Sequence, residues 1–494
     1  MRSYPISAFA LLFALPAQAQ TAVPASLRQQ VEAVLARAPA GTRFGVLVVD
    51  NAGREVLAIN PDQRFMPASN TKLFTTALAF DVMARDPAAA IAGGTVLRLL
   101  DKGKGAPDVA IAGGGGVSLS TAPDCTARCL GSLADKLAAV TRKVGDVIGD
   151  DTAFVDQHWS PGMSWNNIQT DSGTAPSALI VDDNETLLTV TPAAPGLPPV
   201  VQLSPYFTLR NEAVTVAAGE TRLAFERAVN SREVRLHGTI AASAPVWRDL
   251  MGIDSPAHYA AWALQQALQA RGVKVSGKLR VIHRPVQLPG RPDMVAIPAG
   301  KTRIAFIEPP APLAEEVATI NKRSQNLHAE ALLRRAGLAA AAQTIFPTGE
   351  PVQAGSLEAG LQALQAMLGR IGVARTSYDF ADGSGMSSYN RVSPRATVAL
   401  LRWGANQAWG GQWRASLPVG GLDGTLRRRF AGTPLAGKVF AKTGTLNATN
   451  ALSGYLVAAS GRELTFAFMA NDVPGDSGAG AVIDAALATI AQAN

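Results

Sequence analysis

Three short motifs, met in a fixed order along the chain, restrict the fold more than any other feature of this sequence. They are Ser-x-x-Lys at Ser69–Lys72, Ser-x-Asn at Ser324–Asn326 and Lys-Thr-Gly at Lys442–Gly444. Alone, each has an ordinary explanation: a serine that caps a helix, an asparagine in a turn, a lysine exposed on a strand. Together and in this order they indicate one site, so the fold must bring distant segments together.

The first motif has the spacing of a nucleophile and its base. Ser69 and Lys72 precede an apolar helical run, and positions three apart lie on one helix face about one turn apart. A serine hydroxyl attacks a carbonyl only when a base takes its proton, and a lysine serves only when neutral. Burial and the positive charge of Lys442 lower a lysine pKa from about 10.4. We therefore expect acyl transfer to Ser69 with Lys72 as the base.

The pattern of apolar runs predicts an α/β domain interrupted by a long insert. Strand-like and helical runs alternate near both ends of the chain, at 44–50, 55–60, 69–80, 313–339, 357–371, 438–442, 452–459, 464–471 and 482–492. Between them, short β-like runs are broken by Gly and Pro, and a helix at 257–271 and a strand at 273–283 end that region. We predict one catalytic domain formed by 20–85 and 303–494, with a mainly-β insert of one or two subdomains at 86–302.

Longer stretches around the motifs resemble a known family. They are Phe65–Thr76, Ile320–Glu330, Asp382–Ser387 and Leu417–Leu426. The chain is similar to the class C low-molecular-mass penicillin-binding proteins of the penicillin-binding protein 4 type, which are D-alanyl-D-alanine carboxypeptidases/endopeptidases. Their penicillin-recognising, β-lactamase-like domain carries two inserted domains between the first two motifs. The separation of about 250 residues between Lys72 and Ser324 fits that plan.

The resemblance implies a role for each motif residue. Ser324 relays a proton to the leaving amine, and Asn326 orients Lys72 and the substrate amide. Lys442 and Thr443, in the motif completed by Gly444, hold the terminal carboxylate of a D-Ala-D-Ala stem peptide of peptidoglycan. The backbone N–H groups of Ser69 and Thr445 form the oxyanion hole. β-Lactams are expected to acylate Ser69, and no metal ion or other cofactor is expected.

Two departures from the family pattern affect specificity. An acidic residue that recognises a diamino acid side chain is usual in the insert, but this chain reads Trp165-Asn166-Asn167. Side-chain specificity therefore stays open. The run Gly385–Asn390 also differs from the common form; Asp382, Ser384 and Met386 are expected at the cleft floor, with a simple Gly-rich turn as the alternative.

The N-terminus has the features of an export signal. Arg2 precedes an apolar run at 6–15, and Ala17-Gln18-Ala19 supplies a small-x-small cleavage site. We predict a signal peptide at 1–19, a mature chain that begins at Gln20, and a periplasmic location. No later stretch is long and apolar enough to span a membrane.

The two cysteines, Cys125 and Cys129, are expected to pair in an oxidising compartment, although such close spacing can forbid the bond. A metal site is the alternative, but two cysteines without nearby histidines fall short of four ligands. The net charge is +7, but the Lys and Arg residues are scattered along the sequence, so no nucleic-acid partner is expected. The oligomeric state is not predicted.

Two other functions compete with a peptidase. A β-lactamase needs a second base for deacylation, and Glu358 in Glu358–Gln362 resembles such a base. Leucines at 357, 361, 364 and 368 recur at helical spacing, however, so Glu358 more simply flanks the apolar face of a helix. A wall-binding sensor without catalysis would have no need for both Ser69 and Lys72.

Overall fold

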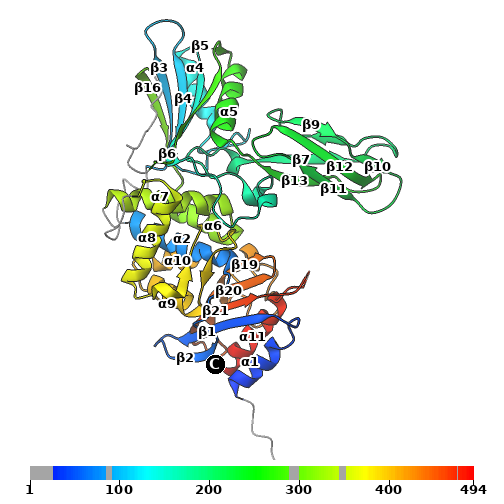
Figure 1. Cartoon of the computed structure of the whole chain (residues 1–494), viewed down its shortest axis with the longest axis vertical. Coiled ribbons are helices and arrows are strands. Elements are labelled where there is room, and N and C mark those ends of the chain that lie inside the picture. Colours follow the sequence, from blue (N-terminus) through cyan, green and yellow to red (C-terminus); the bar gives the residue numbers. More distant parts are fainter. Residues whose placement is uncertain (1–25, 85–91, 289–299, 344–351, 476) are drawn as a thin grey trace, which may run out of the picture.

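The computed structural model describes residues 26–84, 92–288, 300–343, 352–475 and 477–494. The predicted signal peptide and Gln20 therefore lie outside the described residues. The chain forms a lower body that holds the C-terminus, an upper body built around β3, β4 and β6, and a flat third body that contains β7 to β13 (Figure 1). None of the described helices has the combination of length and apolar character needed to cross a membrane. The predicted α/β class is confirmed.

The lower body is built on an antiparallel sheet of order β19-β20-β21-β1-β2. Its strands are β1 (Arg43–Asp50), β2 (Glu55–Ile59), β19 (Val439–Leu446), β20 (Thr449–Val457) and β21 (Glu463–Asn471). Alternation along β1 sends Val46 and Val48 toward α1 (Leu27–Leu35) and α11 (Gly480–Ala493), and Leu47 and Val49 toward Val398 of α9 (Pro394–Ala405). Helices thus cover both faces, and β19 stays at an edge.

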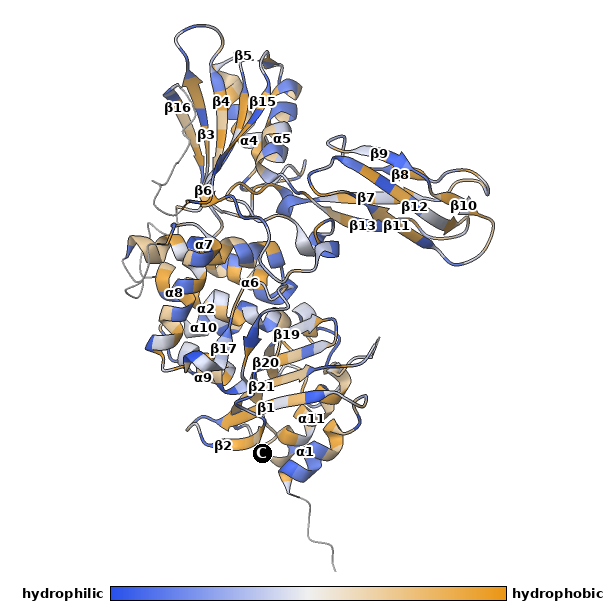
Figure 2. Cartoon of the chain, in the orientation of Figure 1, coloured by the Kyte–Doolittle hydropathy of each residue, from blue (hydrophilic) through white to orange (hydrophobic). Residues whose placement is uncertain are grey.

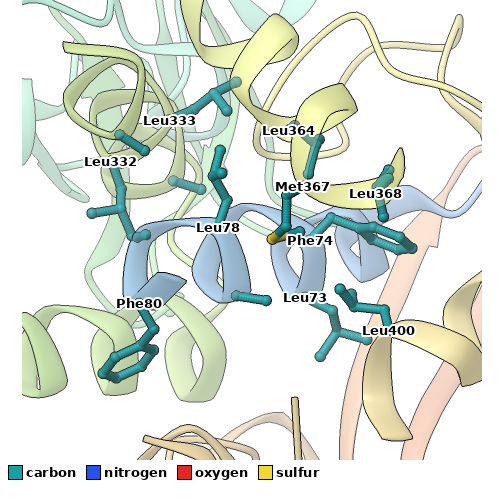
Figure 3. Close-up of a cluster of buried hydrophobic side chains, with 14 of the residues drawn as sticks. Leu73, Phe74, Leu78, Phe80, Leu332, Leu333, Leu364, Met367, Leu368 and Leu400 are labelled. Atoms are coloured by element: carbon teal, nitrogen blue, oxygen red, sulfur yellow. The ribbon is translucent and has the colours of Figure 1, made fainter. Parts of the chain in front are cut away.

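A helical layer follows, with α2 (Thr71–Met83) at its centre. Every residue of α2 is buried, which explains why the helix is apolar on all sides. Figure 3 shows its Leu73, Phe74 and Leu78 among side chains of the surrounding helices. These helices are α6 (Leu313–Arg323), α7 (Asn326–Ala342), α8 (Leu357–Arg370), α9 and α10 (Gly410–Ala415).

The helix predicted at 313–339 is wrong in one respect, because it is two helices. Between α6 and α7, Ser324 adopts φ 62° and ψ 36°, a left-handed conformation that ends α6. Such a residue turns the chain at a helix C-terminus. The second motif, Ser324–Asn326, lies at this break between the two helices.

The upper body holds a mixed sheet of order β15-β6-β4-β3-β16, with α4 (Leu130–Val140) and α5 (Pro256–Ala270) packed on it. Its strands are β3 (Thr95–Asp101), β4 (Asp108–Gly113), β6 (Val147–Val155), β15 (Leu279–Arg284) and β16 (Lys301–Glu308), beside a small pair of β5 (Lys143–Val144) and β14 (Lys274–Val275). Because β16 pairs with β3 over its length, the sheet of the insert extends to Glu308, beyond the boundary predicted at 302.

The third body consists of short strands only. They are β7 (Glu185–Thr191), β8 (Val200–Gln202), β9 (Thr208–Asn211), β10 (Val214–Val216), β11 (Arg222–Glu226), β12 (Glu233–Ala241) and β13 (Trp247–Gly252). Hydrophobic and hydrophilic residues are interspersed along these strands (Figure 2), as expected when one face of a sheet is buried. Buried residues of this body and of the upper body form one continuous apolar cluster.

Candidate active site

The structure brings the three motifs together where α2, the α6–α7 break and β19 meet. Ser69 lies in a short 3₁₀ turn, η1 (Ala68–Asn70), that leads into α2. The Nζ atom of Lys72 donates to Ser69 Oγ at 2.9 Å, to Asn326 Oδ1 at 2.7 Å and to the carbonyl oxygen of Ser384 at 2.6 Å. Lys72 is fully buried, whereas Ser69 is partly exposed. The Ser69 hydroxyl is thus accessible to solvent, whereas the Lys72 amino group that holds it is buried.

The second lysine joins the other two motifs. Lys442 Nζ donates to Ser324 Oγ at 2.9 Å and to the carbonyl oxygen of Thr443 at 2.9 Å. In an uninterrupted helix, residues two apart point to different sides. The left-handed conformation of Ser324 removes this conflict, so Ser324 reaches Lys442 while Asn326 reaches Lys72.

The third motif lies on the edge strand β19, which packs closely on η1. Asn70 Nδ2 donates to the carbonyl oxygen of Lys442 at 3.3 Å. A Cβ atom on Gly444 would lie 2.6 Å from the carbonyl oxygen of Pro67, so only glycine lets the strand approach this closely. Thr443 is partly exposed and Thr445 is exposed. The strand therefore presents these two threonines along the cleft.

Burial controls the charge of both lysines. Loss of solvation lowers the pKa of Lys72 to about 7, although the negative charges of Asp382 and Glu330 oppose the shift. Burial, together with the charge of Lys72, holds the pKa of Lys442 well below its ordinary value. Lys72 can therefore exist neutral near neutral pH, as a base for Ser69 requires.

Two buried carboxylates lie beneath Lys72. Asp382 accepts from the backbone N–H groups of Gly385 at 2.8 Å and Ser387 at 2.6 Å, and from Asn390 Nδ2 at 2.5 Å. Burial and the charge of Glu330 raise the pKa of Asp382 to about 6. The Asp382 carboxylate thus organises the loop that presents the Ser384 carbonyl to Lys72.

Sequence reasoning assigned no role to Glu330. Its Oε1 atom accepts from the N–H groups of Gly383 and Ser384, each at 2.9 Å, and its Oε2 atom pairs with Arg334 Nη1 at 3.0 Å. A signal was present, because Asn326, Glu330 and Arg334 stand four positions apart on one helix face.

The insert supplies one wall of the cleft. The carbonyl oxygen of Ser172 accepts from Asn326 Nδ2 at 3.0 Å, and Asp183 Oδ1 bonds to His328 Nε2 at 2.8 Å. Asn167 lies in η2 (Trp165–Asn167), one turn before the segment that carries Ser172. The loop in which an acidic residue was expected therefore adjoins the site.

Other residues singled out in the sequence lie away from these contacts. Glu358 is exposed in the first turn of α8, where it flanks the buried face of that helix. Cys125 and Cys129 form a disulfide of 2.07 Å in the loop before α4. Within the described ranges, no group of three or more His, Cys, Asp or Glu side chains is arranged to hold a metal ion.

Known proteins are similar to this chain over most of its length. Residues 27–493 match the D-Ala-D-Ala carboxypeptidase 3 (S13) family. A D-alanyl-D-alanine carboxypeptidase of Actinomadura sp. (strain R39) is 33% identical over 491 residues, which cover 94% of this chain and 85% of that protein. The crystal structure of penicillin binding protein 4 (dacB) from Haemophilus influenzae matches with a TM-score of 0.76 at 20% identity, over 93% of this chain and 98% of that one. A structure of the same protein complexed with a β-lactam matches with a TM-score of 0.70.

Proposed function

Because this chain belongs to the D-Ala-D-Ala carboxypeptidase 3 (S13) family, we propose that it is a serine DD-peptidase of peptidoglycan. It cleaves the D-Ala-D-Ala terminus of stem peptides through an ester on Ser69, and β-lactams acylate the same serine. One observation carries the proposal: Lys72 Nζ lies 2.9 Å from Ser69 Oγ, with a pKa lowered to about 7 by burial.

Acylation follows from this pair. Neutral Lys72 takes the hydroxyl proton, and Ser69 Oγ bonds to the carbonyl carbon of the penultimate D-Ala. The backbone N–H groups of Ser69 and Thr445 receive the developing oxyanion, where each donor is typically worth about 10²–10³ in rate. The C–N bond then breaks, and the proton passes through Ser324 to the leaving amine.

The remaining motif residues orient the substrate. Lys442, with Thr443 and Gly444 on the same edge strand, receives the terminal carboxylate beside Ser324. Asn326 donates to the acyl-side amide while its oxygen steadies Lys72. The 2.9 Å contact between Lys442 and Ser324 supports a shared role at the leaving end of the substrate.

Peptide substrates and β-lactams differ in how fast their esters with Ser69 are hydrolysed. After D-Ala departs, water enters, Lys72 takes its proton, and the ester is hydrolysed to the shortened peptide and free Ser69. The leaving group of a β-lactam stays attached and keeps water away. Glu358 is exposed on α8 and takes no part, so the penicilloyl ester persists and a β-lactamase is not favoured.

The location of the enzyme is part of the proposal. The export signal at 1–19 and the substrate both point to the periplasm. Mass spectrometry of the exported protein should give a mature N-terminus at Gln20, and retention of residues 1–19 after export would contradict the cleavage site.

The nucleophile is tested by Ser69→Ala. We expect covalent labelling by a fluorescent penicillin to disappear and D-Ala release to fall by about 10⁴-fold or more, because nucleophile and base act as a unit. Ser132→Ala, the same change at an exposed position of α4, is the control and should be labelled normally. Labelling of Ser69→Ala at the active site would show that another residue is the nucleophile.

A further inference from the structure

A basic groove begins at one end of the active site. It has a volume of about 540 Å³ and is lined by Lys322, Arg323, Gly424, Thr425, Arg427 and Arg428; we call it the arginine groove. Two features join it to the motifs. Arg323 directly precedes Ser324, and the Oγ1 atoms of Thr425 and Thr443 are hydrogen-bonded at 2.8 Å.

Most of the positive charge in this groove is not neutralised. Lys322 is the exception, because its Nζ atom pairs with Asp423 at 2.5 Å. Arg323, Arg427 and Arg428 are exposed, and none of the ion pairs among the described residues includes them, although the charge of Arg323 opposes the rise that burial causes in the pKa of Glu185. Neighbouring Arg429, by contrast, is paired with Asp484 at 2.5 Å. Three guanidinium groups beside the cleft are thus available to an anion.

The groove lies on the leaving side of the bond that is cut. Under the proposed function, Ser324 and Thr443 receive the leaving residue, and these are the residues that adjoin the groove. The acyl part of the substrate lies instead by Asn326, which faces Ser172 of the insert. Whatever follows the scissile bond therefore extends toward the three arginines.

The two substrates of a DD-peptidase differ in this part. In a linear stem peptide, only one D-Ala leaves, and nothing extends into the groove. In a cross-link, the leaving amine belongs to a second stem peptide, which carries further carboxylates. An exposed cationic groove attracts such a strand and would be of no use to a single amino acid.

We propose that the arginine groove binds the anionic second stem peptide of a cross-link and so directs the enzyme toward endopeptidase cleavage. The inference rests on the proposed function and adds to it a binding site for the second strand. The bonds are those already described: the D-Ala carbonyl is transferred to Ser69 Oγ, the amine of the second strand leaves with a proton, and water releases the first strand.

The test compares two purified muropeptides, a cross-linked dimer and the linear pentapeptide, with the double variant Arg427→Gln/Arg428→Gln. We expect the ratio of kcat/KM for dimer over pentapeptide to fall about three- to tenfold, as befits two exposed charge contacts. The control Arg37→Gln/Arg303→Gln makes the same change of charge at two other exposed arginines and should leave the ratio unchanged.

A third substrate separates charge from size. When the carboxylates of the leaving strand are amidated, the double variant and the unaltered enzyme should cleave the dimer equally well. An unchanged ratio in the double variant, or an equal loss with the amidated dimer, would overturn the inference. The proposed function fails in a different way, with neither D-Ala release nor a penicilloyl ester in the unaltered enzyme.

Discussion

At the scale of single residues, the site depends on two buried lysines that share one cleft. Burial lowers the pKa of each lysine, and the charge of Lys72 lowers the pKa of Lys442 further, so the neutral form of Lys72 becomes accessible at about pH 7. An arriving carboxylate favours the charged form of Lys442. The two lysines can thus take different roles even though both are buried.

This leads to a prediction for the pH dependence of acylation. Because the neutral form of Lys72 is the base, the rate should rise with pH through a midpoint near pH 7, the value to which burial lowers its pKa. Stopped-flow acylation by a chromogenic cephalosporin, from about pH 5.5 to 8.5, measures it. Circular dichroism over the same range controls for loss of fold. A flat profile would contradict the role of Lys72.

Asp382→Asn tests the carboxylate beneath Lys72. The negative charge of Asp382 raises the pKa of Lys72, so its removal should move the acylation midpoint to lower pH. The new amide NH₂ would also face Asn390 Nδ2 and backbone donors, which should cost about 1–3 kcal/mol of unfolding free energy. Asp124→Asn, at an exposed carboxylate, is the control for both measurements. A midpoint that stays the same or rises would refute the coupling.

At the scale of elements, the site is made by two interruptions of regular structure. The break between α6 and α7 allows Ser324 and Asn326 to serve different lysines. The edge position of β19 leaves one side of the strand free to face η1 and the substrate.

The contact between β19 and η1 is tested by Gly444→Ala. The added methyl group would lie 2.6 Å from the carbonyl oxygen of Pro67, so strand and turn must separate. A displacement of this kind should slow acylation about 100-fold in a protein that stays folded. Gly369→Ala is the control, since a Cβ there meets no atom within 4 Å and helix α8 should become slightly more stable. Normal acylation by Gly444→Ala would show that the close approach is not required.

At the scale of the whole molecule, the insert both completes the cleft and projects from it. Its apolar residues Phe154 and Ile180 pack on Leu327 and Ala331 of α7, next to the hydrogen bond from Asn326 to Ser172. The third body extends to the side of this contact in Figure 1. Removal of the part that packs on α7 should therefore impair the active site, whereas removal of the third body should not.

Deleting residues 192–246 tests this difference. Val190 of β7 pairs with Trp247 of β13 in antiparallel register, so an Asn-Gly turn can join the two strands as a hairpin. Penicillin acylation should remain within about threefold, whereas stability should fall because the apolar cover of Val190 and its neighbours is lost. The same deletion with Ser69→Ala controls for labelling elsewhere. Loss of acylation in a variant that still unfolds cooperatively would show that the third body completes the site.

Much of this protein follows from short-range pattern alone. The strands at 44–50 and 464–471 and the apolar helix after Ser69 lie close to where periodicity predicts them, because neighbouring residues decide such elements. The motifs also predicted which residues would meet, because the three motifs together carry out acyl transfer only if they lie at one site. No local signal, however, required Ser324 to break a helix. Its conformation is accompanied by contacts from distant segments, from Lys442 to Ser324 and from Lys72 to Asn326.

Tertiary structure decided the rest. Strand β16 belongs to the insert because it pairs in register with β3, a strand that lies about 200 positions earlier in the sequence. The pKa of Lys72 depends on burial and on carboxylates at 330 and 382, and the arginine groove joins residues near 323 to residues near 427. Charge and burial act through space, whereas sequence patterns report only on neighbours a few positions away.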